Sequence, residues 1–112
     1  MIDDPGTVAR LMDQLRAHLP IPALPTKVIV RALRQQGVRV SGKSALTIHS
    51  VLYLGDEAGI TCDVTPAARD AKTVLLVSLT QVRVPASHPL CGAIQAYQRE
   101  RVSRLAAASL FG

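Results

Sequence analysis

The 112-residue sequence predicts one α+β domain, in which two N-terminal helices precede an antiparallel meander sheet and a long C-terminal helix follows it. Apolar residues recur at helical spacing near both ends of the chain, and apolar and polar residues alternate through residues 46–64. The strand patterns all lie between the helical ones. This order is typical of an antiparallel sheet with helices packed on it, and not of a βαβ fold.

The first helix is expected at about residues 7–19. Asp3, Asp4 and Pro5 suit a helix start, because a carboxylate can cap the first turn and proline fits there. One apolar stripe follows at helical spacing, made of Val8, Leu11, Met12, Leu15 and Leu19. Three prolines within residues 20–25 then predict an extended connector between helices.

A second helix is expected at residues 27–36, with Thr26 as its cap and Gly37 as its C-terminal stop. Its buried stripe is expected to hold Val28, Ile29, Ala32 and Leu33. Residues 38–40 are a candidate for a short edge strand, which would make the sheet four-stranded instead of three-stranded. Residues 41–44 form a turn. They lack the upstream glycine and the preceding strand of a phosphate-binding loop.

Residues 46–64 are the clearest pattern in the chain and predict a β-hairpin around the glycine-flanked residues 55–59. Pairing Leu52 with Cys62 separates the side chains into an apolar face and a mixed face. The core face then carries Leu46, Ile48, Ser50, Leu52, Leu54, Ile60, Cys62 and Val64. The mixed face carries Thr47, His49, Val51, Tyr53, Thr61 and Asp63.

Residues 73–84 predict the third strand, and residues 89–109 the last helix. The first half of the strand is apolar on both faces, with Val74 and Leu76 on one and Leu75, Val77 and Leu79 on the other. The last helix is expected to bury Leu90, Ala93, Ile94, Tyr97, Val102 and Leu105, and to leave Gln98, Arg99, Glu100, Arg101 and Arg104 in solvent.

Composition narrows the function classes. One Phe, two Tyr and no Trp argue against a platform on which bases stack. The acidic first residues and the lack of a long apolar run argue against a signal peptide and a membrane span, and two cysteines are too few for a disulfide scaffold. We therefore expect a cytoplasmic protein with reduced thiols. Cys62 is expected in the core, and Cys91 in the first turn of the last helix is a weak candidate for a reactive thiol.

Charge is unevenly distributed along the chain. The net charge is +5, and no acidic residue lies between Asp13 and Asp56. Basic residues concentrate in segment 16–43, and Lys27, Arg31 and Arg34 share one helix face. Such a field attracts nucleic acid or another polyanion, and the candidate contacts are Lys27, Arg31, Arg34, Arg39 and Lys43. A solvated basic face is the alternative interpretation, and the acidic hairpin tip argues against a DNA-binding wing.

Catalysis has little support in the sequence. His49 and Asp63 share the mixed face, where a base and its orienting carboxylate would suit a pocket that also includes Tyr53. No nucleophile accompanies them. The three histidines lie far apart in the sequence and lack ligand spacing, so we expect no metal site and no cofactor.

The leading hypothesis from the sequence is a small interaction module that forms a homodimer through its sheet surface. Val51, Tyr53, Val74 and Leu76 are the candidate interface residues, because a strand that is apolar on both faces needs a second cover. Nucleic-acid binding through the basic segment ranks second. An enzyme or small-ligand binder with a pocket on the mixed face ranks third.

Overall fold

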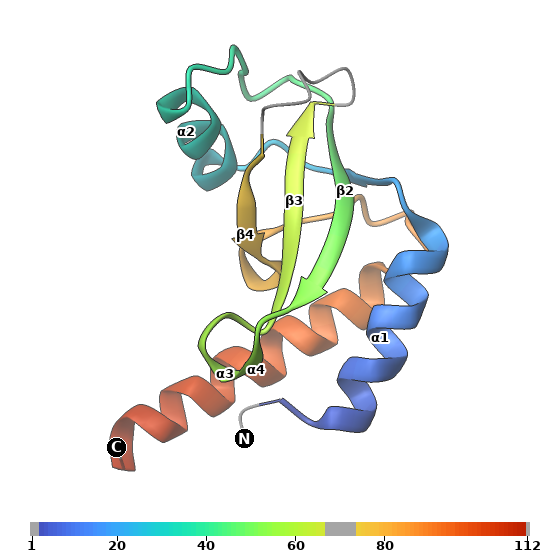
Figure 1. Cartoon of the computed structure of the whole chain (residues 1–112), viewed down its shortest axis with the longest axis vertical. Helices are drawn as coiled ribbons and strands as arrows, with labels where there is room; N and C mark the ends of the chain where they lie inside the picture. Colours follow the sequence, from blue (N-terminus) through green and yellow to red (C-terminus); the bar gives the residue numbers. More distant parts are fainter. Residues whose placement is uncertain (1–2, 67–73, 112) are drawn as a thin grey trace.

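The computed structural model describes residues 3–66 and 74–111, with side chains as far as residue 109 (Figure 1). The elements in chain order are α1 (Pro5–His18), β1 (Ile21–Ala23), α2 (Lys27–Gln35), β2 (Leu46–Tyr53), α3 (Gly55–Ala58), β3 (Ile60–Pro66), β4 (Leu76–Ser78), the 3₁₀ turn η1 (Leu79–Gln81) and α4 (Cys91–Phe111). The predicted α+β class, the two early helices and the long last helix are confirmed.

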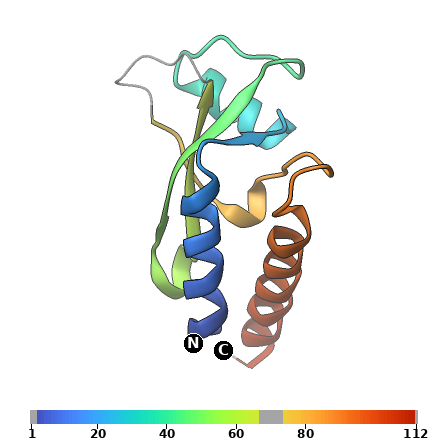
Figure 2. The same cartoon turned by 90° about the vertical axis from the view of Figure 1, so that its right-hand side faces the viewer.

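The four strands form an antiparallel sheet in the order β1-β2-β3-β4. Figure 2 shows α1 and α4 on the same side of this sheet, and α2 at one end of the molecule. The opposite sheet face carries no helix in the described part of the chain, and we call it the open face. The core lies between the sheet and the helices, with Leu15, Leu33, Ile48 and Leu79 fully buried.

Helix α1 starts as the sequence predicts. The Asp4 carboxylate accepts hydrogen bonds from the Thr7 backbone N–H at 2.9 Å and from the Thr7 hydroxyl at 2.8 Å. The buried stripe of this helix is Val8, Leu11, Met12 and Leu15. Because the cap and the stripe agree, the start and the inward face of α1 follow directly from the sequence.

The predicted hairpin exists, but its register was wrong, by one residue between the tip and the bulge and by two residues beyond the bulge. Val51 pairs with Cys62 and Leu52 with Thr61, and the register shifts between Ile48 and Ser50, which makes His49 the extra residue of a bulge. A bulge reverses the alternation of side chains beyond it. Leu46 and Ile48 therefore face the core as predicted, whereas Val51 replaces Leu52 there.

The hairpin tip is one turn of helix, α3, and not a simple loop. Gly55 and Gly59 flank it with φ values of +75° and +64°. The Gly59 N–H donates to the Gly55 carbonyl at 2.7 Å, and the Leu54 N–H donates to the Gly59 carbonyl at 2.9 Å. Leu54 is consequently exposed, although the predicted register placed it in the core.

The fourth strand comes from the proline-rich connector, not from residues 38–40. Ile21 pairs with Ile48 and Ala23 with Leu46. Pro22 lies between them on an edge strand, where its missing N–H deprives no neighbour of a hydrogen bond. The connector therefore contributes two buried side chains, Ile21 and Ala23, to the core.

The predicted strand 73–84 is interrupted, and residue 73 lies outside the described residues. β4 spans only Leu76–Ser78, after which the Ser78 hydroxyl accepts from the Thr80 N–H and starts η1. The chain is extended again beyond η1, and the Leu24 N–H donates to the Arg83 carbonyl at 2.8 Å. This turn carries residues 82–86 from the sheet towards α4.

Two helix faces differ from the prediction. In α2, Val30 is buried and Val28 is 53% exposed. In α4, Val102 and Leu105 are exposed, whereas Arg101 is buried. The apolar face of α4 ends with Tyr97, because the helix extends past the sheet in Figure 1 and its last turns meet no further core.

Candidate functional site

Helix α2 positions the first group of basic side chains. The Thr26 hydroxyl caps it by accepting from the Ile29 N–H at 3.4 Å, and Ile29, Val30 and Leu33 anchor its inner face in the core. Helical geometry then directs Lys27 and Arg31 to the outer face, about 6 Å apart along the axis. Both side chains are exposed, which leaves their charges in solvent.

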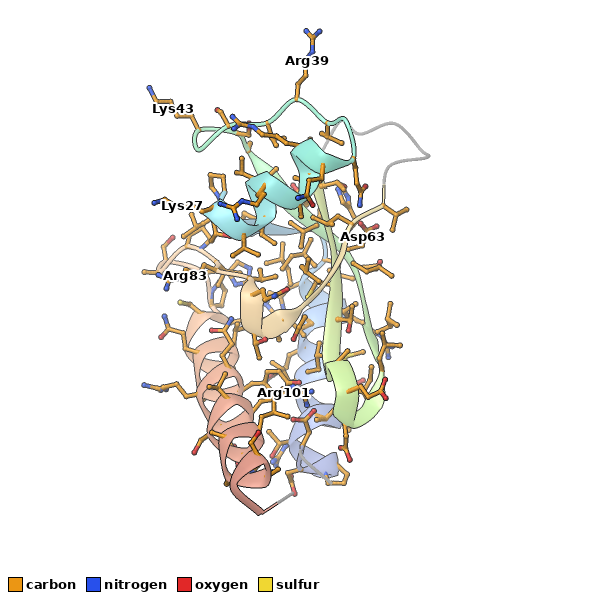
Figure 3. The ribbon with its side chains drawn as sticks, turned by 90° about the vertical axis from the view of Figure 1, so that its left-hand side faces the viewer. Lys27, Arg39, Lys43, Asp63, Arg83 and Arg101 are labelled. Carbon is orange, nitrogen blue, oxygen red and sulfur yellow. The ribbon has the colours of Figure 1, made fainter. Side chains whose placement is uncertain are left out.

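The loop after α2 contributes the second group. Arg39 and Lys43 are exposed, and Figure 3 shows Lys43 and Lys27 pointing to the same side while Arg39 points off the end of the molecule. The turn at residues 41–44 is held by the Ser41 N–H, which donates to the Ser44 hydroxyl at 2.9 Å. We call Lys27, Arg31, Arg34, Arg39 and Lys43 the basic end.

Arg34 differs from the other residues of the basic end because its side chain makes a structural hydrogen bond. Its Nε donates to the Val40 carbonyl at 2.8 Å, which ties the loop to α2. Two shallow hollows border the same helix, with volumes of about 440 Å³ and about 290 Å³. Lys27, Arg31 and Gln35 line both, and Arg34 lines the larger one. The predicted common face of Lys27, Arg31 and Arg34 is therefore present.

Charge separates along the molecule. Two ion pairs, Arg101–Asp3 and Arg104–Glu100, lie towards the opposite end, where Asp56 and Glu57 also sit in α3. Within residues 3–66 and 74–109, the side chains of Lys27, Arg31, Arg39 and Lys43 have no acidic partner. Among the described residues, the basic end is thus a region of positive charge without acidic partners.

The three candidate catalytic residues have separate surroundings. His49 Nε2 lies 3.3 Å from the carbonyl oxygens of both Thr65 and Pro66. The imidazole ring therefore contacts the backbone at the end of β3. The buried Asp63 carboxylate accepts from the Leu75 N–H at 3.4 Å, and its residue pairs across the sheet with Ser50. Tyr53 stands at the far end of β2, where desolvation and the nearby Asp3 carboxylate raise its pKa.

The predicted interface residues divide into two sets. Val51 is only 7% exposed and belongs to the core, so its prediction as an exposed interface residue was wrong, and the bulge is the reason. Tyr53, Val74 and Leu76 are exposed at 38%, 47% and 50%. Leu76 pairs with Asp63 on the open face, where Thr61, Asp63 and Thr65 of β3 are buried although no described helix covers them.

A buried polar cluster at the α3 end has no counterpart in the sequence predictions. Arg101 Nη1 donates to the Asp3 carboxylate at 2.8 Å, and its Nη2 donates to the Asp56 carbonyl at 2.6 Å. The Tyr97 hydroxyl donates to the same Asp3 oxygen at 3.2 Å and accepts from the Ile60 N–H at 3.0 Å. Burial raises the pKa of Tyr97 to about 12.

This cluster is structural in its geometry, because it joins three distant segments: the N-terminus, the hairpin tip and α4. Figure 3 shows Arg101 between these elements. Gly59 lies against it, with φ +64° and with Arg101 atoms 2.8 and 2.9 Å from where a Cβ would stand. A paired and hydrogen-bonded charge can remain buried, whereas removing one partner would leave the other uncompensated.

Both cysteines are buried and unpaired. Burial raises the pKa of the Cys62 thiol to about 12, as expected for a core thiol. Cys91 begins α4 and lines a hollow of about 450 Å³ together with Leu24, Val82, Arg83, Val84 and Ala86.

The histidines are closer together than their sequence positions suggest. The rings of His18 and His88 meet edge to face, with centroids 5.8 Å apart. The described residues contain no cluster of three His, Cys, Asp or Glu side chains that would hold a metal ion. Among the described helices, none combines the length and the apolar character that crossing a bilayer requires.

Comparisons with protein-family models, with curated proteins and with solved structures found no match to this chain.

Proposed function

We propose that the protein is a nucleic-acid-binding module that contacts the phosphate backbone through its basic end. The observation that carries the proposal is the gathering of Lys27, Arg31, Arg39 and Lys43 at one end of the molecule without acidic partners among the described residues. When such exposed cations contact phosphates, they displace counterions that are condensed on the nucleic acid, and this release drives sequence-independent binding.

The geometry favours backbone contacts over base reading. Lys27 and Arg31 project from an exposed, amphipathic helix that the core holds rigidly, and the loop that carries Arg39 and Lys43 is tied to it through Arg34. The basic end has no aromatic side chain on which a base could stack. Phosphate contacts position a protein on nucleic acid but carry no sequence information directly.

The test is duplex DNA binding, measured by fluorescence anisotropy across a series of salt concentrations. Replacing Lys27 and Arg31 with alanine should remove up to two phosphate contacts and flatten the logarithmic salt dependence by up to about 1.8, at roughly 0.9 per contact. Arg34 is left intact because its bond to Val40 holds the loop.

The matched control replaces Arg10 and Arg16, two exposed cations of α1, with alanine. Net charge falls equally in both variants, so a local interface predicts a large effect only for the α2 variant. Binding weaker than about 10⁻⁴ M at physiological salt, unchanged by either pair of substitutions, would mean that the basic end only solubilises the protein. Preference for an acidic polypeptide over DNA would also reject the proposal.

We propose self-association through the open face as a second function, which would pair two copies of the sheet. Val74 and Leu76 support it, because they are about half exposed on a face that carries no helix in the described residues. Light scattering should give about twice the 12.0 kDa chain mass, and Leu76→Lys should restore the monomer. A monomer at every concentration would exclude this second function.

We also propose a cytoplasmic location. The two thiols are unpaired and buried on different elements, β3 and α4, which suits a reducing compartment. Intact mass under non-reducing conditions, measured on protein from a reducing host compartment, should show two free thiols, and a stable bond between Cys62 and Cys91 would contradict the proposed location.

A further inference from the structure

A hollow of about 450 Å³ lies between α4 and residues 82–86, and none of the five side chains of the basic end lines it. Its volume falls within the range of small-molecule sites, roughly 300–1,000 Å³. Val82, Val84 and Ile94 form an apolar floor that belongs to the core, and Leu24 adds a partly exposed apolar edge.

The charged side chains around the hollow have one sign. Arg83 lines one wall and Arg99 the other, and none of the described lining residues is acidic. Both arginines are exposed, and Figure 3 shows Arg83 pointing away from the body of the molecule. Two exposed arginines at the rim of an apolar floor complement a ligand that has an apolar body and an anionic head.

The two walls are fixed to one another. Gln98 Nε2 donates to the Leu79 carbonyl at 2.7 Å and to the Val82 carbonyl at 2.5 Å, and so joins α4 to η1 and the following residue. The opposite wall is held by the Leu24 N–H, which donates to the Arg83 carbonyl. A preformed hollow spares a ligand the cost of ordering its site.

We propose that this hollow binds a small amphipathic carboxylate, with its chain against Val82, Val84 and Ile94 and its carboxylate between Arg83 and Arg99. Arginine is suited to this role because its planar fork can donate two parallel hydrogen bonds to a carboxylate. The ligand class follows from the combination of one apolar floor, two cations and the absence of acid among the described lining residues.

The experiment is calorimetric titration of the full chain with decanoate, below the concentration at which it forms micelles. Decanoate should bind, and a decyl trimethylammonium salt of the same chain length should not. Arg99→Met and Arg83→Met should each weaken decanoate binding by about 10-fold or more, as the loss of a charge-assisted hydrogen bond predicts. Arg16→Met, which removes the same charge from α1, should leave the affinity unchanged.

A second variant tests the site independently of charge. Ala86 is an exposed lining residue, so the tryptophan side chain of Ala86→Trp should fill the hollow from its rim and abolish binding. The circular dichroism spectrum should stay unchanged, which would show that the variant keeps its fold. Equal affinity in all variants would assign decanoate to non-specific apolar surface and overturn the proposal. Binding of decyl phosphate at least 10-fold tighter than decanoate would overturn the carboxylate assignment. DNA binding by the basic end is measured separately, so either result is independent of the proposed nucleic-acid function.

Discussion

Gly59 is the position where a single methyl group should disturb the fold most. Its φ of +64° lies in the left-handed region, and an added Cβ would overlap the Tyr97 hydroxyl and stand 2.8 Å from Arg101 Cζ. With ψ −143° this conformation is almost restricted to glycine and costs another residue about 1–3 kcal/mol. Crowding against two packed side chains adds about 1–3 kcal/mol, so Gly59→Ala should lower the free energy of unfolding by roughly 2–6 kcal/mol.

Gly55 provides the matched control, because it lies at the other end of α3 with φ +75° and with nothing within 4 Å of where an alanine methyl group would stand. Gly55→Ala should therefore cost only the backbone component, about 1–2 kcal/mol. Urea unfolding followed by circular dichroism gives both values. Equal costs for the two substitutions would refute the close packing of Gly59 against α4.

The hydroxyl of Tyr97 can be tested in the same background. Tyr97→Phe removes the oxygen that the Gly59→Ala methyl would meet, but it also removes hydrogen bonds to Asp3 and Ile60. The double variant should consequently lose less stability than the sum of the single variants, by about 0.5–3 kcal/mol for residues in contact. Strict additivity would place the two groups out of contact.

Burial and register lead to three further predictions. Tyr97 and Cys62 keep their protons in the folded protein up to pKa values of about 12, above the ordinary 10.0 and 9.0, so stability should be full below pH 9 and fall as pH rises from 9 to 12. Urea unfolding at several alkaline pH values checks this, and a flat profile would contradict it. Ile48→Ala should cost about 2–5 kcal/mol, and Leu52→Ala on the open face clearly less; equally large costs at both positions would restore the register predicted from sequence, which places both side chains in the core. Cys62 is fully buried, so a thiol reagent should modify it only through opening of the fold, at a rate that rises with urea; a fast rate independent of urea would show that the thiol is accessible in the native state.

The helices could be predicted well because their signals are local. Asp4 and Thr26 cap the helices that follow them, and Gly37 ends α2 with φ +84°. Each of these signals acts within one helical turn. The basic face of α2 could be predicted for the same reason, since i, i+4 and i+7 spacing determines a common face wherever the helix lies.

The sheet was harder because pairing joins distant residues. A signal for the bulge does exist: His49 and Ser50 are two consecutive polar residues between Ile48 and Val51, which breaks strict alternation. If β2 is assumed to alternate without a bulge, every side chain after Ser50 is assigned to the wrong face. β1 was missed because three prolines in residues 20–25 mask an edge strand that has only three residues.

The buried cluster shows a different limit. Leu90, Ile94, Tyr97 and Arg101 are spaced as one helix face, so the burial of Arg101 could have been inferred from its position. Its partner could not, because Asp3 lies 98 residues away and no local pattern links them. Charged residues on an apolar helix face are therefore better treated as candidates for buried pairs than as solvated side chains.

The two ends of the molecule use their charges in different ways. At the α3 end, the Asp3 carboxylate accepts hydrogen bonds from Arg101 and Tyr97, and the fold depends on those contacts. At the basic end, only Arg34 has such a structural contact among the described residues, and alanine at Lys27 or Arg31 would leave every described hydrogen bond of α2 intact. The fold therefore requires the charges of Asp3 and Arg101, but it does not require those of Lys27 and Arg31. Positive side chains that the fold does not need, gathered on one rigid surface, are the ones we expect an anionic partner to contact.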